Sequence, residues 1–126
     1  MKDLQQTGQT LVALLIFMML AILIGTTAVA ITVINAQSGT AYSSGNIAFD
    51  DATTGAENAL LRLERDPTYT GETMTLVNGT ATITVSGSGT KTITSVGDFG
   101  NFERTVTVVA TYANNTITPT SWTETP

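Results

Sequence analysis

The chain has 126 residues, a formal net charge of −5 and neither Cys nor His. Without Cys there is no disulfide or thiolate metal site, and without His the commonest general base and metal ligand are missing, which argues against an enzyme, a metal site or another cofactor. With only five Lys and Arg residues, the domain offers no basic stripe, so it is not expected to bind nucleic acid by itself.

An uncharged apolar segment follows the first ten residues. No Asp, Glu, Lys or Arg occurs from Leu11 to Ile34, and about 20 helical residues are enough to cross the hydrocarbon core of a bilayer. A buried helix of a soluble protein is the alternative. The remaining chain is too short to surround a helix that is apolar on every side, so a membrane helix is predicted.

Three fates of this segment lead to different mature proteins. A secretory signal would use Lys2 as its basic start and the small residues 28–30 as its cleavage site. Against it, Asp3 offsets the charge of Lys2, and apolar residues resume at Ile31. An uncleaved anchor would keep the whole segment. The third fate is processing as a prepilin.

The start of the segment carries a family resemblance. The stretch QTGQTLVALLI, residues 6–16, resembles the prepilin tract of type IV pilins, in which a short polar leader ending in Gly precedes a long apolar helix. The resemblance implies that a prepilin peptidase cuts between Gly8 and Gln9. It would remove a leader of residues 1–8 and leave a transmembrane helix of residues 9–35. Gln9 stands where the family usually has Phe.

Ala13 is a second departure from the family pattern, because most pilins have Glu at this place. In the family, that carboxylate lies in an apolar helix bundle and is thought to neutralise an N-terminal amine, which would otherwise be a costly unpaired charge. Ala13 cannot do this. The resemblance therefore implies a low-copy subunit, at a tip or an initiation point, that depends on a major pilin bearing the acid.

Residues 36–66 are predicted to continue the helix as an amphipathic one. The stretch 36–46 is small and polar, and each of its two glycines costs a helix about 1 kcal/mol, so the helix can bend or unwind there. The helix should end by Asp66, because Pro67 cannot continue it. Apolar residues at helical spacing form the expected landing face of a soluble domain: Phe49, Ala52, Ala56, Ala59 or Leu60, and Leu63. Polar residues are expected on the solvated face: Asp50, Asp51, Glu57, Asn58, Arg62 and Glu64.

The stretch from Ala48 to Leu63 carries a second resemblance. Minor pilins with a PilX-type N-terminal region have a similar Ala-rich segment at the matching distance from the membrane helix, and many of them also lack the usual Glu. The resemblance implies a structural minor pilin or pseudopilin of a type IV pilus-like filament. Its partners would be the inner membrane, the prepilin peptidase and other pilin subunits, contacted through the N-terminal helix. Its C-terminal domain would lie outside the cytoplasm, and on an extracellular filament after assembly.

Residues 67–126 are predicted to form a threonine-rich antiparallel β-domain. Asn78-Gly79 is a strong hairpin signal, and residues 80–85 alternate Thr with apolar side chains. Turns are also expected at residues 87–89 and 114–115, and residues 97–101 indicate a glycine-rich loop. A last edge strand should end at Trp122, whose ring would close the core. The predicted fold class is α+β, a long N-terminal helix packed on a small antiparallel meander of about four to five strands.

The acidic residues do not predict a site. Asp98-Phe99-Gly100 copies a kinase tripeptide without the other kinase motifs, and Asp98, Asn101 and Glu103 fit a loop turn better than a Ca²⁺ site. Asp50, Asp51 and Glu57 fit a solvated helix face better than a pair of catalytic carboxylates. Two other functions stay open: a pseudopilin of a type II secretion system, and a membrane-anchored or secreted β-domain that binds an envelope partner.

Overall fold

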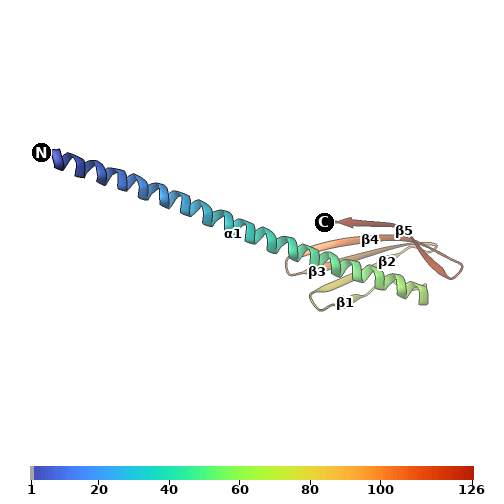
Figure 1. Cartoon of the computed structure of the whole chain (residues 1–126). Helices are drawn as coiled ribbons and strands as arrows, with labels where there is room; N and C mark the ends of the chain where they lie inside the picture. Colours follow the sequence, from blue (N-terminus) through green and yellow to red (C-terminus); the bar gives the residue numbers. More distant parts are fainter. Residues whose placement is uncertain (1) are drawn as a thin grey trace. The chain divides into compact units, whose positions relative to one another are not determined.

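The computed structural model describes residues 2–126, with side chains from Gln6 onward. Its elements are α1 (Lys2–Arg65), β1 (Thr73–Thr75), β2 (Thr80–Ser86), β3 (Thr90–Phe99), β4 (Phe102–Ala113) and β5 (Thr116–Thr125), labelled in Figure 1. The chain divides into two units, Met1–Thr40 and Ala41–Pro126, and the second unit contains the sheet. Met1, the first residue of the predicted leader, lies outside the described residues.

Residues 36–46 belong to the continuous helix α1. The sequence had indicated that the helix could bend or unwind in this stretch. Glycine costs a helix only about 1 kcal/mol, and extending an existing helix needs no new nucleus. Gly45 also has a packing role, because a Cβ there would lie 3.4 Å from the guanidinium of Arg104 on β4. α1 ends at Arg65, next to Asp66, as the following Pro67 predicts.

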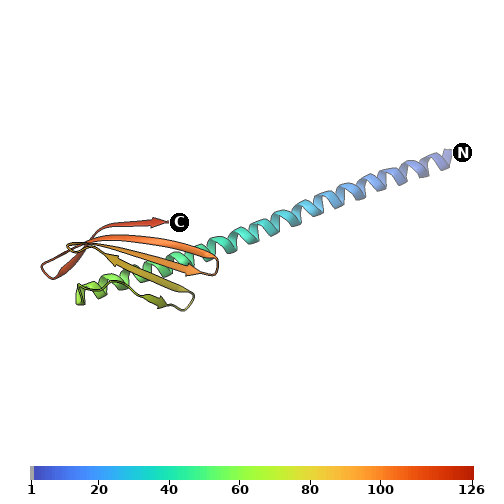
Figure 2. The ribbon, with the colours of Figure 1, turned by 180° about the vertical axis from the view of Figure 1, so that it is seen from behind.

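The five strands form one antiparallel sheet in the order β1-β2-β3-β4-β5. The predicted α+β fold with an antiparallel meander is therefore confirmed. The C-terminal part of α1 lies along one face of this sheet, as both views of the ribbon show (Figures 1 and 2). Asn114 and Asn115 connect β4 to β5 with φ values of 53° and 62°, which suit the two-residue hairpin turn expected there.

The hairpin between β1 and β2 is present, but its turn differs from the one that Asn78-Gly79 favours. The connection comprises residues 76–79 and is closed by the Leu76 N–H, which donates to the Gly79 carbonyl oxygen at 2.9 Å. Neither Asn78 nor Gly79 has a positive φ. Gly79 is instead required by space, because a Cβ there would lie 2.1 Å from the Asp98 carbonyl oxygen.

The prediction of a glycine-rich loop at residues 97–101 is wrong. β3 continues to Phe99, and residues 100–101 alone make the turn into β4. Gly97 belongs to the strand because the helix lies against it: a Cβ there would be 2.0 Å from the Ala48 carbonyl oxygen. Gly55 makes the matching approach from the helix, where a Cβ would be 2.9 Å from the Cβ of Ala81. These two glycines set the spacing between helix and sheet.

The core lies between α1 and this face of the sheet. The helix contributes five fully buried residues at three- and four-residue spacing: Ala48, Ala52, Ala56, Ala59 and Leu63. The three central strands contribute alternate residues: Ala81, Ile83, Val85, Ile93, Val106, Val108 and Ala110. Helical periodicity predicted this stripe except for Ala48. Phe49 is only partly buried and packs against the cluster from its edge, so Leu63 is the main large apolar anchor of the helix.

The opposite face of the sheet is hydroxylic. Serines and threonines occupy most positions of this face. Four threonines are cross-strand neighbours from β2 to β5 and form one row: Thr84, Thr94, Thr107 and Thr123.

The first and last strands are the edges of the sheet. Trp122, on the edge strand β5, is 44 % exposed and does not belong to the core cluster. The expectation that it closes the core is wrong: the buried residues of the sheet belong to β2, β3 and β4, and the edge strands add only the partly buried Met74 and Ile117 to the core.

Replacing Gly97 by Ala should destabilise the second unit by about 1–3 kcal/mol, the usual cost of overpacking, because the new methyl group would collide with the backbone of α1. The measurement is the urea midpoint of the full chain in detergent micelles, followed by fluorescence of the only Trp. Gly89→Ala is the matched control, since nothing lies within 4 Å of a Cβ at Gly89. Equal midpoints for the two variants would contradict the close approach.

Candidate membrane and assembly site

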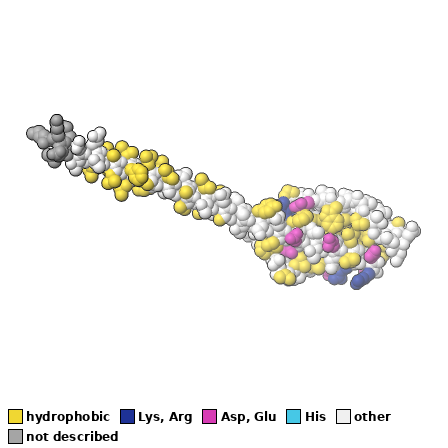
Figure 3. Space-filling model, viewed as in Figure 1, with side chains coloured by type: hydrophobic (Ala, Val, Ile, Leu, Met, Phe, Trp, Pro, Cys, Tyr) yellow, Lys and Arg dark blue, Asp and Glu magenta, His cyan; other side chains and the backbone are white. Residues whose placement is uncertain are grey.

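The apolar segment of α1 is uncovered. The side chains from Gln6 to Ser43 are all exposed, and the helix is long and apolar enough to cross a membrane. Figure 3 shows apolar side chains along this part of the helix. From Leu11 to Ile34 the helix spans about 36 Å at 1.5 Å per residue, slightly more than the hydrocarbon core of about 30 Å. Within the described chain nothing covers this surface.

The few polar side chains of this segment are satisfied inside the helix. The Thr26 hydroxyl is 3.0 Å from the carbonyl oxygen of Ile22, and the Thr32 hydroxyl is 2.9 Å from that of Ala28, in the geometry of donated hydrogen bonds. Thr27 donates in the same way to Leu23. A hydroxyl that bonds to its own helix does not need water, so these threonines are compatible with a hydrocarbon environment.

The residues predicted for processing lie in the first unit. Gly8 and Gln9 are helical and exposed, and a Cβ at Gly8 would have open space around it. Ala13 is also exposed, and it borders a shallow hollow of about 380 Å³ together with Gln6, Gln9 and Thr10. Gln9 and Ala13 thus share one accessible surface, whereas Gly8 is exposed but does not border the hollow. Their roles in cleavage and assembly stay predictions.

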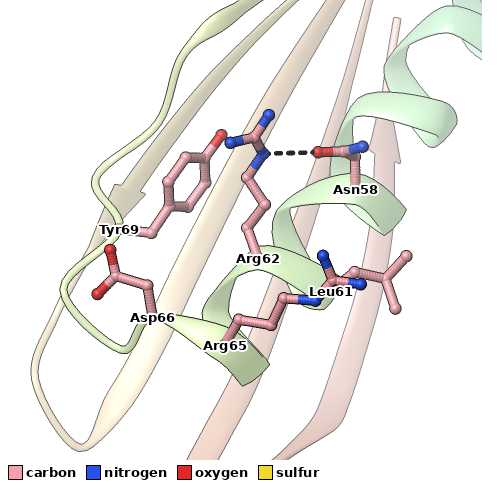
Figure 4. A pocket seen from close by; sticks show the side chains of 6 residues that line it. All are labelled: Asn58, Leu61, Arg62, Arg65, Asp66 and Tyr69. Carbon is pink, nitrogen blue, oxygen red and sulfur yellow. Dashed lines mark hydrogen bonds between the residues drawn. The ribbon is translucent and has the colours of Figure 1, made fainter.

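The second unit has a pocket of about 400 Å³ at the C-terminal end of α1 (Figure 4). It is lined by the last two turns of the helix and the chain that follows: Asn58, Leu61, Arg62, Arg65, Asp66 and Tyr69. Arg62 is held from two sides, because its Nε donates to the Asn58 Oδ1 at 3.1 Å and a terminal nitrogen lies 2.8 Å from the Glu72 carboxylate. Two basic residues in a last helical turn also compensate the negative end of the helix dipole.

The polar groups around this pocket hold the chain that leaves the helix. Thr68 donates both its N–H and its hydroxyl to the Asp66 carboxylate, at 2.9 and 2.6 Å, and these bonds lower the pKa of Asp66. Burial and the nearby Glu72 carboxylate raise the pKa of Tyr69, against the opposing effect of Arg62. Lys91 on β3 donates to the Pro67 carbonyl oxygen at 3.0 Å. This cluster closes the helix end and fastens it to the sheet.

Asp51 departs from the predicted solvated face. It is only 7 % exposed, and its Oδ2 has no hydrogen-bond partner among the described residues. The same oxygen would be 2.7 Å from a Cβ at Gly79, so the β1–β2 loop lies over it. Desolvation, and secondly the charge of Asp50, raise the pKa of Asp51. Helical spacing places position 51 between the buried positions 48 and 55 on the same face, but it does not show that the β1–β2 loop, distant in sequence, covers the carboxylate.

The other carboxylates that the structure describes do not form a metal site. Asp98 and Glu103 are cross-strand partners on the exposed end of the β3–β4 hairpin. Over the described part of the chain, no group of three or more acidic side chains is placed to hold a metal ion. Of the residues predicted for assembly, Leu63 lies in the helix–sheet core and Phe49 packs against it. Both therefore support the domain on its helix.

Replacing Asp51 by Asn should stabilise the second unit at neutral pH, because it removes a desolvated, unpartnered charge. A raised folded pKa means that the folded state binds more protons between the ordinary value of about 3.9 and the raised one. Stability of the natural chain should therefore fall as pH rises through that window, and the advantage of the Asn variant should vanish below it. Thermal midpoints from pH 3 to 8 test this.

Glu57→Gln is the control for this series, because Glu57 is exposed on the same helix. It should change neither the midpoint nor its pH dependence. An Asp51→Asn variant that is less stable than the natural chain at neutral pH would mean that the carboxylate has a favourable partner in its ionised form.

No protein-family model, curated protein or solved structure matches this chain significantly.

Proposed function

We propose that this protein is a pilin-like structural subunit, of the minor pilin or pseudopilin kind, rather than an enzyme. One observation carries the proposal: a single helix, α1, has an uncovered apolar segment in its first part and supports an antiparallel sheet with its last part. In this proposal the first part is held in the membrane and can pass into a bundle of similar helices. The sheet is the exposed domain of the assembly.

The surface of the apolar segment supports helix packing as well as lipid contact. After a run of large side chains that includes Leu15 and Phe17, small residues occur among the large ones, and Ala21 and Gly25 are four residues apart. Small residues at this spacing let neighbouring helices approach closely. A Cβ at Gly25 would have open space around it, so no group of the described chain occupies that position. In this proposal the partners are other pilin subunits, and the C-terminal domain lies outside the cytoplasm.

Cleavage by a prepilin peptidase is proposed between Gly8 and Gln9. The support is positional, because Gly8 is the last glycine before the apolar segment and lies on an exposed surface. Glycine also weakens a helix by about 1 kcal/mol, which makes local unwinding near the chain terminus easier. An unwound backbone is what a peptidase must bind.

The test is N-terminal sequencing of the mature protein from cells that contain the peptidase. We expect Gln9 as the first residue, and Gly8→Leu should leave the full-length precursor in the membrane. Gly25→Leu is the matched control, since it also replaces a helical glycine in open space but leaves the boundary intact. A mature N-terminus at Ile31 would indicate a secretory signal, and Met1 would indicate an uncleaved anchor. Either result contradicts the proposal.

Ala13 supports a low-copy role in the proposed assembly. A homopolymer would repeat an unpaired N-terminal amine in a low-dielectric bundle at every subunit, at a cost of several kcal/mol for each buried charge. A subunit at a tip, or dispersed among acid-bearing subunits, avoids that repetition.

We expect no filaments when this chain is the only pilin present with the assembly machinery, and only a few copies per native filament by quantitative mass spectrometry. Ala13→Glu should raise the copy number if the missing carboxylate limits incorporation, whereas Ala21→Glu, a control in the same segment, should not. Filaments made of this chain alone, or a copy number equal to that of the major subunit, would refute the low-copy role. Recovery in a secretion apparatus would favour a type II pseudopilin instead.

A further inference from the structure

The sheet has two free edges, β1 and β5. β5 has ten residues, all exposed except Ile117. At the edge of a sheet, every second residue turns its N–H and C=O away from the neighbouring strand, and an added extended strand can bind these groups. Natural proteins usually protect such edges with Pro, Lys or a bulge. The distribution of these features along β5 is therefore informative.

Only the first half of β5 is protected. Pro119 lacks an N–H, and the ladder with β4 shifts there because Val109 pairs with Ser121 and Ala110 with Pro119. The residue left over in this bulge is Thr120, whose hydroxyl donates to the Val109 carbonyl oxygen at 3.0 Å. The second half, residues 121–125, contains neither Pro nor Lys. We call residues 121–125 the open edge.

The acidic side chains at both edges form ion pairs within their own chain. The only charged residue of the open edge is Glu124, whose carboxylate lies 3.8 Å from the Arg104 guanidinium on β4. The acidic residue before β1 is Glu72, whose carboxylate lies 2.8 Å from the Arg62 guanidinium. Each acid is thus paired with an arginine of its own chain. Two copies of a chain with net charge −5 can bring these edges together with little like-charge repulsion.

We propose that the open edge of one copy pairs in parallel with β1 of a second copy in the same membrane. In an antiparallel meander β1 and β5 run in the same direction, so a β5-to-β1 contact keeps both copies in the same orientation. Antiparallel pairing of β5 with itself would turn the two Ala41 ends in opposite directions, whereas the β5-to-β1 contact turns both toward the same side. The inference rests on the membrane anchorage in the proposed function, but not on filament assembly.

The pairing has a favoured register. Successive ladders place Thr73, Thr82, Val96, Thr105 and Thr125 in one row across the sheet. Two copies at the same level would therefore place Glu124 beside Glu72 of the neighbour. A slide of two residues, about 7 Å, places Thr123 beside the neighbour's Thr73 and Glu124 beside its Met74 instead, so the two like charges no longer lie opposite each other.

In that register, the side chains that meet across the new contact are compatible on both faces of the sheet. Trp122 pairs with the buried Val108, and Met74 pairs with the buried Ala81, so both lie on the helix side of the sheet. They would be diagonal neighbours across the new contact, within reach of a sulfur–aromatic interaction. Thr73 and Thr123 lie on the hydroxylic face, where the rows of threonine would continue from one copy to the next.

The proposed contact between β5 and β1 is small and therefore weak. β1 has three residues, so the new ladder is short and buries far less than the roughly 1,000 Å² of a stable interface. Confinement of both copies to one membrane raises their effective concentration and can offset this weakness. The pairing should therefore be detectable in membranes and lost when the chains are diluted in detergent.

The absence of Cys makes engineered disulfides a direct test. The full chain carrying both Thr73→Cys and Thr123→Cys is expressed in membranes without any pilus machinery, and the membranes are oxidised with copper phenanthroline. A ladder of covalent multimers is expected. Either single variant, and Thr94→Cys in the middle of the same face, should stay at the background level of random collisions. Retention of the chain in membranes after carbonate extraction reports anchorage separately.

A double variant that stays at background while remaining in the membrane would overturn the pairing and leave the proposed function standing. Dimers of the Thr123→Cys single variant above the Thr94→Cys background would also overturn it, since they indicate β5 pairing with itself. Loss of the chain from the membrane would instead refute the anchorage. As a second test, adding Trp122→Lys to the double variant should abolish the ladder with an unchanged circular dichroism spectrum, because a lysine protects the edge. An undiminished ladder contradicts the proposal.

Discussion

The close approach of α1 to the sheet is the constraint on which the second unit depends. Four of the five fully buried residues of the helix are alanines, and Gly55 and Gly97 remove the side chains that would otherwise hold the two layers apart. Small residues bury little area each, so stability must come from contact between backbones and from Leu63 and the branched side chains of the central strands. A helix so close to a sheet has no tolerance for an added methyl group at either glycine.

The close approach of helix and sheet also determines the environment of the charged side chains at the two ends of the interface. Asp51 lies on the buried side of the helix and is covered by the β1–β2 loop, so its carboxylate is desolvated without a partner. At the other end of the interface, Arg62 forms an ion pair with Glu72, and Lys91 donates a hydrogen bond to the Pro67 carbonyl oxygen. These contacts hold the segment that connects α1 to β1. One end of the interface is therefore fastened by charge-assisted contacts, whereas the other carries a destabilising carboxylate and should respond to pH.

Two surfaces of the described chain are left without partners, and they differ in chemistry. The first part of α1 exposes apolar side chains whose burial requires lipid or neighbouring helices. The open edge of β5 exposes backbone hydrogen-bonding groups, which an extended strand satisfies. A subunit held in a membrane and taken into an assembly would use both kinds of surface, since one provides non-directional attraction and the other provides a defined register.

The sequence alone determined the apolar segment, the end of the helix before Pro67, the stripe from Ala52 to Leu63 and most strands, because each follows from local composition or from a period of two or 3.6 residues. Only the tertiary structure decided that Gly97 continues a strand, that Asp51 is buried and that Trp122 is exposed. These three depend on how near the helix lies and how far it extends across the sheet, and this geometry is fixed by contacts between residues distant in sequence. Periodicity shows which side of an element is apolar, but it does not show where the covering layer ends.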